Sequence, residues 1–249
     1  MAATPLPRLY DATLAPWWPL LSPPEEDADE AAWILKALCG SLGRTPAHIL
    51  ELGSGGGNIA SHLTPHARLT LVDLSPDMLA VSRRLNPDTE HIEGDMRSVH
   101  LGRSFDAVMI HDAIMYMTTE RDLVTALATA HAHLKPDGAL IVIPDHVAET
   151  YEPGIETGGS DAPDGRGLRY IIWRHQPAPG GTTYDTDFAI LTRHADGLVE
   201  AFHDRHTVGL FSRDTWRKAF GAAGFAPPAV SQDPWRRDVW IGRPVGAKG

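Results

Sequence analysis

Cysteine is almost absent from this sequence, and signals of several special protein classes are missing as well. The single cysteine, Cys39, excludes an internal disulfide. No apolar run approaches the roughly 20 residues that a membrane-spanning helix needs. The N-terminus has no basic stretch followed by an apolar one, so we expect no secretory signal and a cytoplasmic location. The 249 residues fit one α/β domain with elaborations.

Basic residues are scarce too. The chain has 22 Lys and Arg against 32 Asp and Glu, which gives a formal net charge of −10, and it has no long basic run. Nucleic-acid binding requires several phosphates to be neutralised by Lys and Arg. We therefore expect a small-molecule substrate and no nucleic-acid or membrane partner. The sequence leaves a homodimer open.

A glycine-rich turn follows the apolar residues 49–52 and is the most informative feature of the chain. Residues 49–58 predict a strand, a tight turn and a helix start, and Asp73 ends a second predicted strand. This pattern is typical of the nucleotide-binding half of a doubly wound α/β sheet. The dinucleotide fingerprint G-x-G-x-x-G requires Gly or Ala where Asn58 stands, and Glu51 would repel a pyrophosphate. The turn therefore favours a nucleoside that carries positive charge.

The order of these motifs resembles that of the class I S-adenosylmethionine-dependent methyltransferases. The first motif of that family is an acidic residue followed by G-x-G-x-G, which matches residues 51–57 here. The second is an acid that ends strand two, Asp73, and the third is an acid after strand three, Asp95. Predicted strands at 105–110 and 139–143 complete the order. The resemblance covers residues 46–144.

The resemblance implies a role for each motif. Asp73 would hold both ribose hydroxyls, Asp95 would hold the adenine amine, and Met96 would offer its backbone N–H to the adenine. Glu51 would favour the ammonium group of the cofactor electrostatically. Tyr10 would reach the cofactor carboxylate from an N-terminal lid, or would only pack against nearby tryptophans. The predicted cofactor-binding set is Tyr10, Glu51, Gly53, Ser54, Gly55, Asp73, Leu74, Met78, Asp95, Met96 and His111.

Changes in composition and hydrophobic pattern along the chain predict four segments of a single domain, residues 1–249. Residues 1–45 form an N-terminal lid with a helix that ends at Gly40, and residues 46–150 form the cofactor-binding core. Residues 151–211 form an antiparallel extension, and residues 212–249 a C-terminal helix and an edge strand at 237–242. The predicted fold is Rossmann-like α/β, with a doubly wound, mostly parallel sheet, an N-terminal helical lid and an antiparallel β extension.

The extension begins with a polar, glycine-rich stretch at 151–167, which predicts a mobile loop. Three β-rich runs follow at 168–175, 183–194 and 198–210, and we expect the last to join the main sheet. The layout is similar to that of the amino-sugar N-methyltransferases of the small-molecule branch. Members of that group carry a Tyr-Asp pair near the N-terminus, matched by residues 10–11, and a Leu-Phe-Thr-like strand end, matched by residues 209–214.

Candidate catalytic residues follow the fourth predicted strand, at the sheet edge where ligands bind. Methyl transfer from a sulfonium is an in-line displacement, so alignment in a water-poor site supplies much of the acceleration. A base is needed only if the nucleophile arrives protonated, and histidine is best matched to neutral pH. We predict His111, Asp112 and Tyr116 as catalytic residues. In the alternative, His111 only orients the cofactor.

Other polar clusters are weaker candidates for a functional site. Asp145 and its neighbour end strand five on the same edge and are candidates for the acceptor pocket. His203 and His206 invite a metal site, but strand side chains alternate faces, so residues three apart cannot easily share one ion. No Cys pattern supports zinc either, and we predict no metal. Arg205 or His206 is a candidate for binding an acceptor carboxylate.

The predicted function is methyl transfer from S-adenosylmethionine to nitrogen or oxygen of a small molecule, with a hydroxyl or carboxylate O-methyltransferase as the nearest rival. A nicotinamide-dependent oxidoreductase is a rival of another class, but Asn58, Glu51 and the lack of a Tyr-x-x-x-Lys pair argue against it. A protein that binds the cofactor without transferring methyl groups would carry identical motifs.

Overall fold

The structure is a computed structural model that describes residues 7–246. Its centre is a seven-stranded sheet in the order β10-β11-β5-β4-β1-β2-β3. The pairs among the five strands β1 to β5 are parallel, and the two C-terminal strands pair antiparallel. The strands are β1 (His48–Leu52), β2 (Arg68–Asp73), β3 (Glu90–Glu93), β4 (Phe105–Ile110), β5 (Leu134–Val142), β10 (Ala229–Gln232) and β11 (Asp238–Gly242). The predicted Rossmann-like α/β fold is confirmed.

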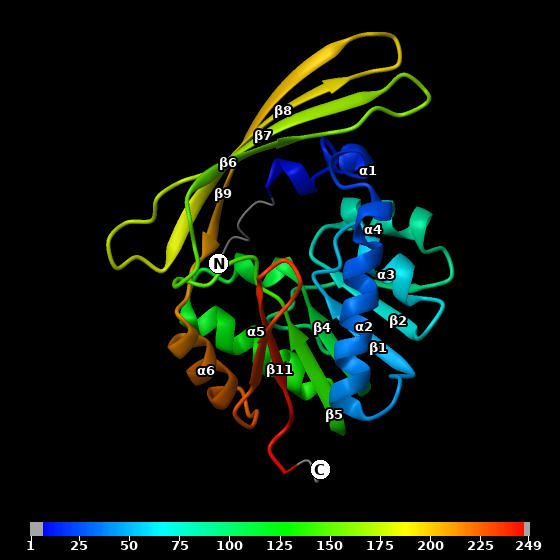
Figure 1. Cartoon of the computed structure of the whole chain (residues 1–249). Helices are drawn as coiled ribbons and strands as arrows, with labels where there is room; N and C mark the ends of the chain where they lie inside the picture. Colours follow the sequence, from blue (N-terminus) through cyan, green and yellow to red (C-terminus); the bar gives the residue numbers. More distant parts are fainter. Residues whose placement is uncertain (1–6, 247–249) are drawn as a thin grey trace.

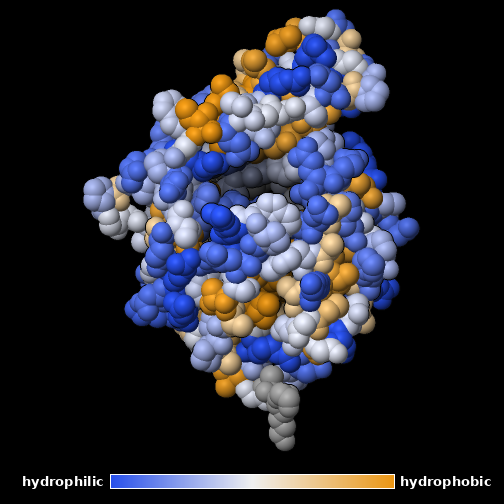
Figure 2. Space-filling model, in the orientation of Figure 1, coloured by the Kyte–Doolittle hydropathy of each residue, from blue (hydrophilic) through white to orange (hydrophobic). Residues whose placement is uncertain are grey.

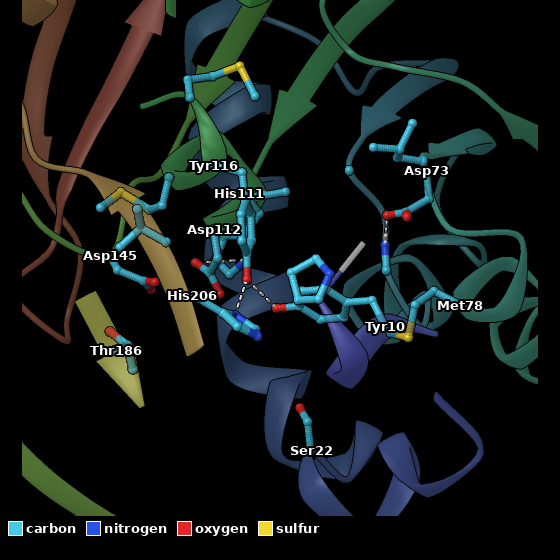
Figure 3. Close-up of a pocket in the computed structure, with 18 of the residues that line it drawn as sticks. Tyr10, Ser22, Asp73, Met78, His111, Asp112, Tyr116, Asp145, Thr186 and His206 are labelled. Atoms are coloured by element: carbon cyan, nitrogen blue, oxygen red, sulfur yellow. Dashed lines mark hydrogen bonds and ion pairs between the residues drawn. The ribbon is translucent and has the colours of Figure 1, made fainter. Parts of the chain in front are cut away.

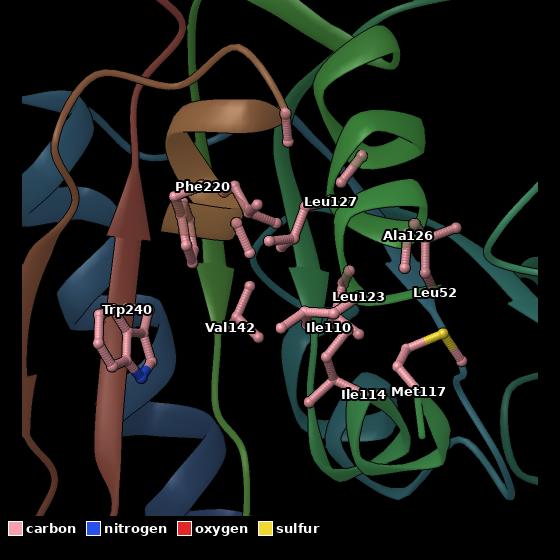
Figure 4. Packing of buried hydrophobic residues seen from close by; sticks show 14 of the residues in the cluster. Leu52, Ile110, Ile114, Met117, Leu123, Ala126, Leu127, Val142, Phe220 and Trp240 are labelled. Carbon is pink, nitrogen blue, oxygen red and sulfur yellow. The ribbon is translucent and has the colours of Figure 1, made fainter. Parts of the chain in front are cut away.

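The sheet has a helical layer on each face (Figure 1). Alternate residues of the buried strands point to opposite faces, so Leu50, Val108 and Val142 join one core and Ile49 with Met109 the other. Figure 4 shows the first of these cores, where β4 and β5 pack against helices of the C-terminal half. The helices are α2 (Ala28–Leu42), α3 (Asn58–Leu63), α4 (Pro76–Leu85), α5 (Glu120–Ala132) and α6 (Arg213–Ala222).

Helix ends follow the local sequence signals, with one exception. The hydroxyl of Ser75 accepts a hydrogen bond from the backbone N–H of Met78, and the following proline opens α4. Ser212 caps α6 in the same way. The prediction that the first long helix ends at Gly40 is wrong. Because Gly43 supplies the left-handed conformation (φ 68°) at the helix end, α2 continues to Leu42.

The extension is a separate four-stranded antiparallel sheet that stands over one end of the core (Figure 1). Its strands are β6 (Gly154–Gly158), β7 (Gly167–Arg174), β8 (Thr183–Arg193) and β9 (Val199–Gly209). Two predictions about it are wrong. Part of the presumed loop at 151–167 is strand β6, since its backbone pairs with β7. The last strand does not join the main sheet either, because β9 pairs along its whole length with β8.

The C-terminal edge also differs from the prediction. The expected edge strand at 237–242 starts at Asp238 and lies inside the sheet as β11, between β5 and β10. The actual edge, β10, is a four-residue strand whose side chains are all exposed. An edge strand without a buried face has no hydrophobic alternation, which is why the sequence pattern did not reveal it.

The N-terminal segment fills the space between the extension and the core. It consists of short turns of helix, η1 (Arg8–Tyr10), η2 (Ala15–Trp17), α1 (Trp18–Leu21) and η3 (Pro24–Asp27). Leu9 and Trp17 pack with Leu168 and Ile190 of the extension, whereas Ala15 packs with side chains of α4. This segment therefore ties the extension to the cofactor-binding half of the sheet.

Replacing Trp240 with alanine is expected to destabilise the fold strongly. The indole is fully buried on β11, and its ring stacks on those of Trp216 and Phe220 at 5.7 and 6.1 Å. Removing a buried aromatic side chain costs roughly 3–5 kcal/mol. Chemical denaturation would measure the free energy of unfolding, with Trp173→Ala as control because that ring is 54% exposed. Equal losses in both variants would contradict the assignment of the core.

Candidate active site

A deep cleft separates the extension from the carboxyl ends of the parallel strands, and Figure 2 shows its mouth below the extension. Its volume is about 2030 Å³. Pockets that hold one drug-sized ligand measure roughly 300–1,000 Å³, so the cleft has room for two such molecules. All thirteen residues predicted from the sequence line it: Tyr10, Glu51, Gly53, Ser54, Gly55, Asp73, Leu74, Met78, Asp95, Met96, His111, Asp112 and Tyr116.

The glycine turn after β1 forms the floor of the cleft. Gly53 has a φ of 77°, a conformation that residues with a side chain adopt at a cost. A Cβ atom on Gly53 would lie 2.3 Å from the Cβ of Ala113 and 2.9 Å from the methyl group of Met96. Gly55 also has a positive φ, and a Cβ atom added there would lie 3.7 Å from the methyl group of Met78, an ordinary contact. The turn therefore needs glycine both for its backbone conformation and for the close approach of its neighbours.

Asp73 ends β2 beside this turn (Figure 3). One carboxylate oxygen accepts the backbone N–H of Gly55 at 2.7 Å, and the other accepts that of Ser75 at 2.8 Å. Burial raises the pKa of Asp73, although these N–H donors oppose the shift. A carboxylate has about four acceptor positions, so two further donors of a ligand can bind to it. Donors spaced like a ribose diol suit this geometry.

Glu51 lies under the turn and is 3% exposed. Its Oε2 atom has no hydrogen-bond partner among residues 7–246. Burial raises the pKa of Glu51 to about 8, because desolvation penalises the charged carboxylate. A cationic group bound in the cleft would supply the missing partner and restore the charge. An unpartnered acid at this place fits the ammonium of S-adenosylmethionine and does not fit a phosphate.

The predicted adenine site is already partly occupied by protein contacts. The Asp95 carboxylate is paired with the guanidinium of Arg97, with N–O distances of 2.6–3.0 Å, and this pair lowers the pKa of Asp95. Met96 packs against Gly53 from the same loop. On the opposite side, Leu74 is half exposed at the rim and Met78 is buried beneath the turn.

His111 is held in a charged cluster at the end of β4. Its Nε2 lies 2.6 Å from a Glu30 oxygen, and its Nδ1 lies 3.2 Å from a carboxylate oxygen of Asp112. Arg237 also contacts Glu30. Burial opposes a charge on the imidazole, but Asp112 and Glu30 outweigh it and raise the pKa of His111 to about 9. At neutral pH the ring is protonated and has no lone pair with which to accept a proton.

Tyr116 and Tyr10 meet in the middle of the cleft, with their hydroxyl oxygens 2.8 Å apart (Figure 3). The Tyr116 hydroxyl also lies 2.6 Å from Nδ1 of His206, which projects from β9. Burial raises the pKa of both tyrosines above the ordinary value of 10, so both hydroxyls are neutral. Residues from three distant parts of the chain thus form one hydrogen-bonded group.

Strand alternation correctly predicted the two faces of β9. His203 points outward and binds Asp187, whereas His206 points into the cleft and is 2% exposed. Arg205 also binds Asp187, through two hydrogen bonds. Within the described part of the chain, no group of three or more His, Cys, Asp or Glu is placed to hold a metal ion. Nor does any described helix have the length and hydropathy of a membrane span.

Some residues in or beside the cleft escaped the sequence analysis. Glu30 lies in the acidic first turn of α2, and Asp204 lies in a polar strand, so neither has a distinctive local pattern. Arg237 lies in no long basic run and was not singled out either. Their common signal is an unexpected charged residue on a buried face, which becomes visible only when the fold is known.

The extension supplies the wall opposite the cofactor half. Asp145 follows β5, and its neighbour His146 packs its ring against Tyr151 and Tyr184 at 5.3 and 6.0 Å. Burial, followed by the nearby charge of Asp112, raises the pKa of Asp145 to about 7. This wall is therefore both aromatic and acidic.

The fold and the site define an enzyme that binds a nucleoside cosubstrate with a positive charge. Comparisons with known proteins agree. The family described as "Methyltransferase domain" matches residues 49–138. The chain is 31% identical, over 88% of its length and 80% of the relative, to a dTDP-3-amino-3,6-dideoxy-alpha-D-glucopyranose N,N-dimethyltransferase of Streptomyces fradiae. It belongs to the class I S-adenosylmethionine-dependent methyltransferases, and it transfers a methyl group to a small-molecule acceptor.

Solved structures share the fold over most of the chain. The crystal structure of Streptomyces venezuelae DesVI has a TM-score of 0.80 at 26% identity, covering 88% of this chain and 92% of that one. CalS10, an amino pentose methyltransferase from Micromonospora echinaspora solved with S-adenosylmethionine bound, has a TM-score of 0.73 at 26% identity, covering 86% and 90%. The family, the fit of Glu51 and Asp73, and this bound relative establish S-adenosylmethionine as the cofactor.

Substituting Gly53 with alanine is expected to weaken S-adenosylmethionine binding at least tenfold. The added methyl group collides with Ala113 and forces the turn to move. Calorimetric titration measures the Kd. Gly102→Ala is the matched control, since Gly102 has a similar φ of 65° but no atom within 4 Å of its added Cβ. Unchanged binding in Gly53→Ala would contradict the role of the turn.

The His111 cluster predicts a pH-dependent contribution to stability. The folded state holds the His111 proton up to a pKa of about 9, against 6.5 for the free side chain. The contribution is therefore complete below pH 6.5 and is lost as the pH rises through 9. The stability difference between wild type and His111→Gln should shrink by roughly 2–3 kcal/mol from pH 6 to pH 9.5. A difference that stays constant across this window in denaturation experiments would refute the assignment.

Proposed function

We propose that this enzyme methylates the amino group of an amino sugar. The observation that carries the proposal is the 31% identity, over most of both chains, to N,N-dimethyltransferases that act on dTDP-linked 3-amino sugars in Streptomyces fradiae and Streptomyces venezuelae. The alignments cover 81–88% of this chain, so the likeness extends well beyond the cofactor-binding core at 46–150.

The electrostatics of the acceptor wall support an amine. Asp112 and Asp145 line the cleft near the tyrosine pair, and the charge of Asp112 makes Asp145 costlier to ionise. An ammonium bound between them would relieve this repulsion, whereas a carboxylate would increase it. The wall therefore favours amine acceptors over acids.

Each cofactor group has a proposed partner in this chain. Asp73 binds the ribose hydroxyls, Asp95 and Met96 bind the adenine, and Glu51 balances the ammonium through its unpartnered oxygen. Ser54, Leu74 and Met78 line the rest of the nucleoside site. When bound, S-adenosylmethionine supplies an electrophilic methyl group on a sulfonium. The chain itself binds and orients the cofactor and the acceptor, and it excludes water from the reacting groups.

His111 is proposed as an orienting residue. Its raised pKa and its hydrogen bond to Glu30 keep it protonated at neutral pH, so it holds Asp112 in place at the end of β4 and does not remove protons. Asp112 and Tyr116 face the acceptor half of the cleft, where they contact the substrate.

The remaining proposals concern the whole chain. We propose that residues 1–249 act as one methyltransferase domain, whose lid (1–45), core (46–150), extension (151–211) and C-terminal part (212–249) all line the cleft. We also propose that the enzyme works in the cytoplasm on a dissolved acceptor, and a homodimer is its proposed assembly. The acidic net charge of −10 supports a partner that is not nucleic acid.

An acceptor panel tests the proposed function. Nucleotide-linked 3-amino sugars should gain one or two methyl groups by mass spectrometry, whereas the matched 3-hydroxy sugars and a tricarboxylic acid should remain unchanged. The expected preference for amine over hydroxyl is at least a hundredfold in kcat/KM, because a site built for one hydrogen-bonding group rejects analogues that lack it. Turnover of the hydroxyl or carboxylate compounds alone would overturn the proposal.

A further inference from the structure

Three buried polar atoms without a hydrogen-bond partner lie around the glycine turn. Within residues 7–246, eight buried side-chain nitrogen or oxygen atoms lack such a partner. Among them are Nε1 of Trp18, Oε2 of Glu51 and Oγ of Ser54, and all three residues line the cleft. A buried polar atom that stays unpaired costs stability, so several of them at one place indicate a ligand site.

Trp18 reaches this turn from the N-terminal segment. It is the first residue of α1, and its indole lies so close to Gly56 that a Cβ atom there would be 2.4 Å from Cδ1 and 2.6 Å from Nε1 of the ring. The glycine therefore leaves the room that the indole occupies. Ser54 lies two residues earlier in the turn and is 7% exposed. The indole N–H and the serine hydroxyl thus come to the same turn from two distant segments.

The three unpaired atoms differ in what they can bind. An indole N–H can only donate a hydrogen bond and a serine hydroxyl can also donate one, whereas an ionised carboxylate can only accept. Two donors beside one acid match a ligand that carries a carboxylate next to an ammonium. The amino-acid end of S-adenosylmethionine is such a group, because both of its charges are attached to one carbon atom.

Other side-chain donors at this end of the cleft already have protein partners. The amide nitrogen of Asn58 binds the carbonyl and the hydroxyl of Ser22 at 3.0 and 3.1 Å. The imidazole of His111 is held between Glu30 and Asp112. Neither side chain can turn to a ligand without giving up these contacts.

The hydroxyl of Tyr10 belongs to a different part of the cleft. The family resemblance predicts this residue as the partner of the cofactor carboxylate. In the structure its oxygen accepts a hydrogen bond from Tyr116 at 2.8 Å, in the middle of the cleft (Figure 3). Its ring lies 5.9 Å from that of Trp18. The indole is therefore the side chain of the N-terminal segment whose unpaired donor lies at the turn.

We propose that Trp18 and Ser54 bind the carboxylate of S-adenosylmethionine, through the indole N–H and the hydroxyl, beside the ammonium that Glu51 balances. Hydrogen bonds to a charged group are stronger than those between neutral groups. The N-terminal segment thereby recognises the cosubstrate as an amino acid as well as a nucleoside. The inference rests on the proposed pairing of Glu51 with the ammonium, and it does not depend on the acceptor.

Calorimetric titration with three ligands tests the proposal. S-adenosylmethionine carries both charged groups of the amino acid, its decarboxylated form keeps the sulfonium and the ammonium, and methylthioadenosine has neither group. In Trp18→Phe and in Ser54→Ala, the Kd of S-adenosylmethionine should rise roughly 10- to 100-fold, because a hydrogen bond to a charged group is lost. The other two ligands have no carboxylate, so their Kd values should stay nearly unchanged.

Trp17→Phe is the matched control. This neighbouring indole packs against His194 of the extension, with ring centroids 5.0 Å apart, so its replacement should leave all three affinities unchanged. If Trp18→Phe does not fold, Ser54→Ala supplies the test. Equal losses for the three ligands, or no loss, overturn the proposal. A loss confined to S-adenosylmethionine that appears in Tyr10→Phe and not in Trp18→Phe overturns it as well.

NMR of the indole N–H groups provides a second readout, without turnover. The resonance that disappears in Trp18→Phe identifies the Trp18 indole in the wild-type spectrum. It should shift when S-adenosylhomocysteine is added and stay in place when methylthioadenosine is added, because only the first of these ligands has a carboxylate. A resonance that moves equally with both ligands, or with neither, overturns the proposal.

Failure of the Glu51 pairing gives a different result. Glu51→Gln should weaken both ligands that carry an ammonium and leave methylthioadenosine unchanged. If it weakens neither, that pairing is wrong, whatever Trp18→Phe shows. Failure of the proposed amine acceptor would change none of these titrations, because they contain no acceptor.

Discussion

The close approach of other elements to the turn after β1 is the constraint on which the site depends. Each of three glycines in this turn faces a different part of the chain: Gly53 faces Ala113, Gly56 faces Trp18, and Gly57 faces α4. A side chain at any of these positions would come within about 2.5 Å of its neighbour. The turn thus sets the spacing between the strand-end acids, the N-terminal segment and the loop that carries the predicted catalytic residues.

Charge determines what this tightly packed turn can hold. Glu51 is buried, and one of its oxygens has no hydrogen-bond partner among the described residues. This acid therefore disfavours a phosphate at the turn and favours a cation. On the acceptor side, Asp112 and Asp145 likewise favour a cationic group over an anionic one. Between the two acidic regions, the hydrogen-bonded side chains of Tyr10, Tyr116, His206 and Asp204 link the lid, the core and the extension.

The sequence predicted the cofactor half well because its signals are local. A glycine turn, a strand-end acid and buried strands of alternating faces each need only a few neighbouring residues, and all thirteen predicted site residues line the cleft. Predictions failed where long-range pairing decides the outcome. β6 is a strand only because β7 lies beside it, and β10 was hidden because it has no buried face. The partners of His111 and Tyr116 lie 81 and 90 residues away, on Glu30 and His206, and local patterns do not reveal such pairings.

The central claim is that this cleft holds S-adenosylmethionine through the turn, Glu51 and Asp73. Calorimetric titration of wild type and Asp73→Asn with S-adenosylmethionine, S-adenosylhomocysteine and NAD tests it most directly. The account predicts saturable binding of both sulfur nucleosides to wild type, a loss of at least tenfold in Asp73→Asn, and no heat with NAD. It also predicts that S-adenosylmethionine binding tightens as the pH rises toward 8, the pKa of Glu51 in the free protein, and gains nothing further above it. Binding of NAD alone would contradict the account.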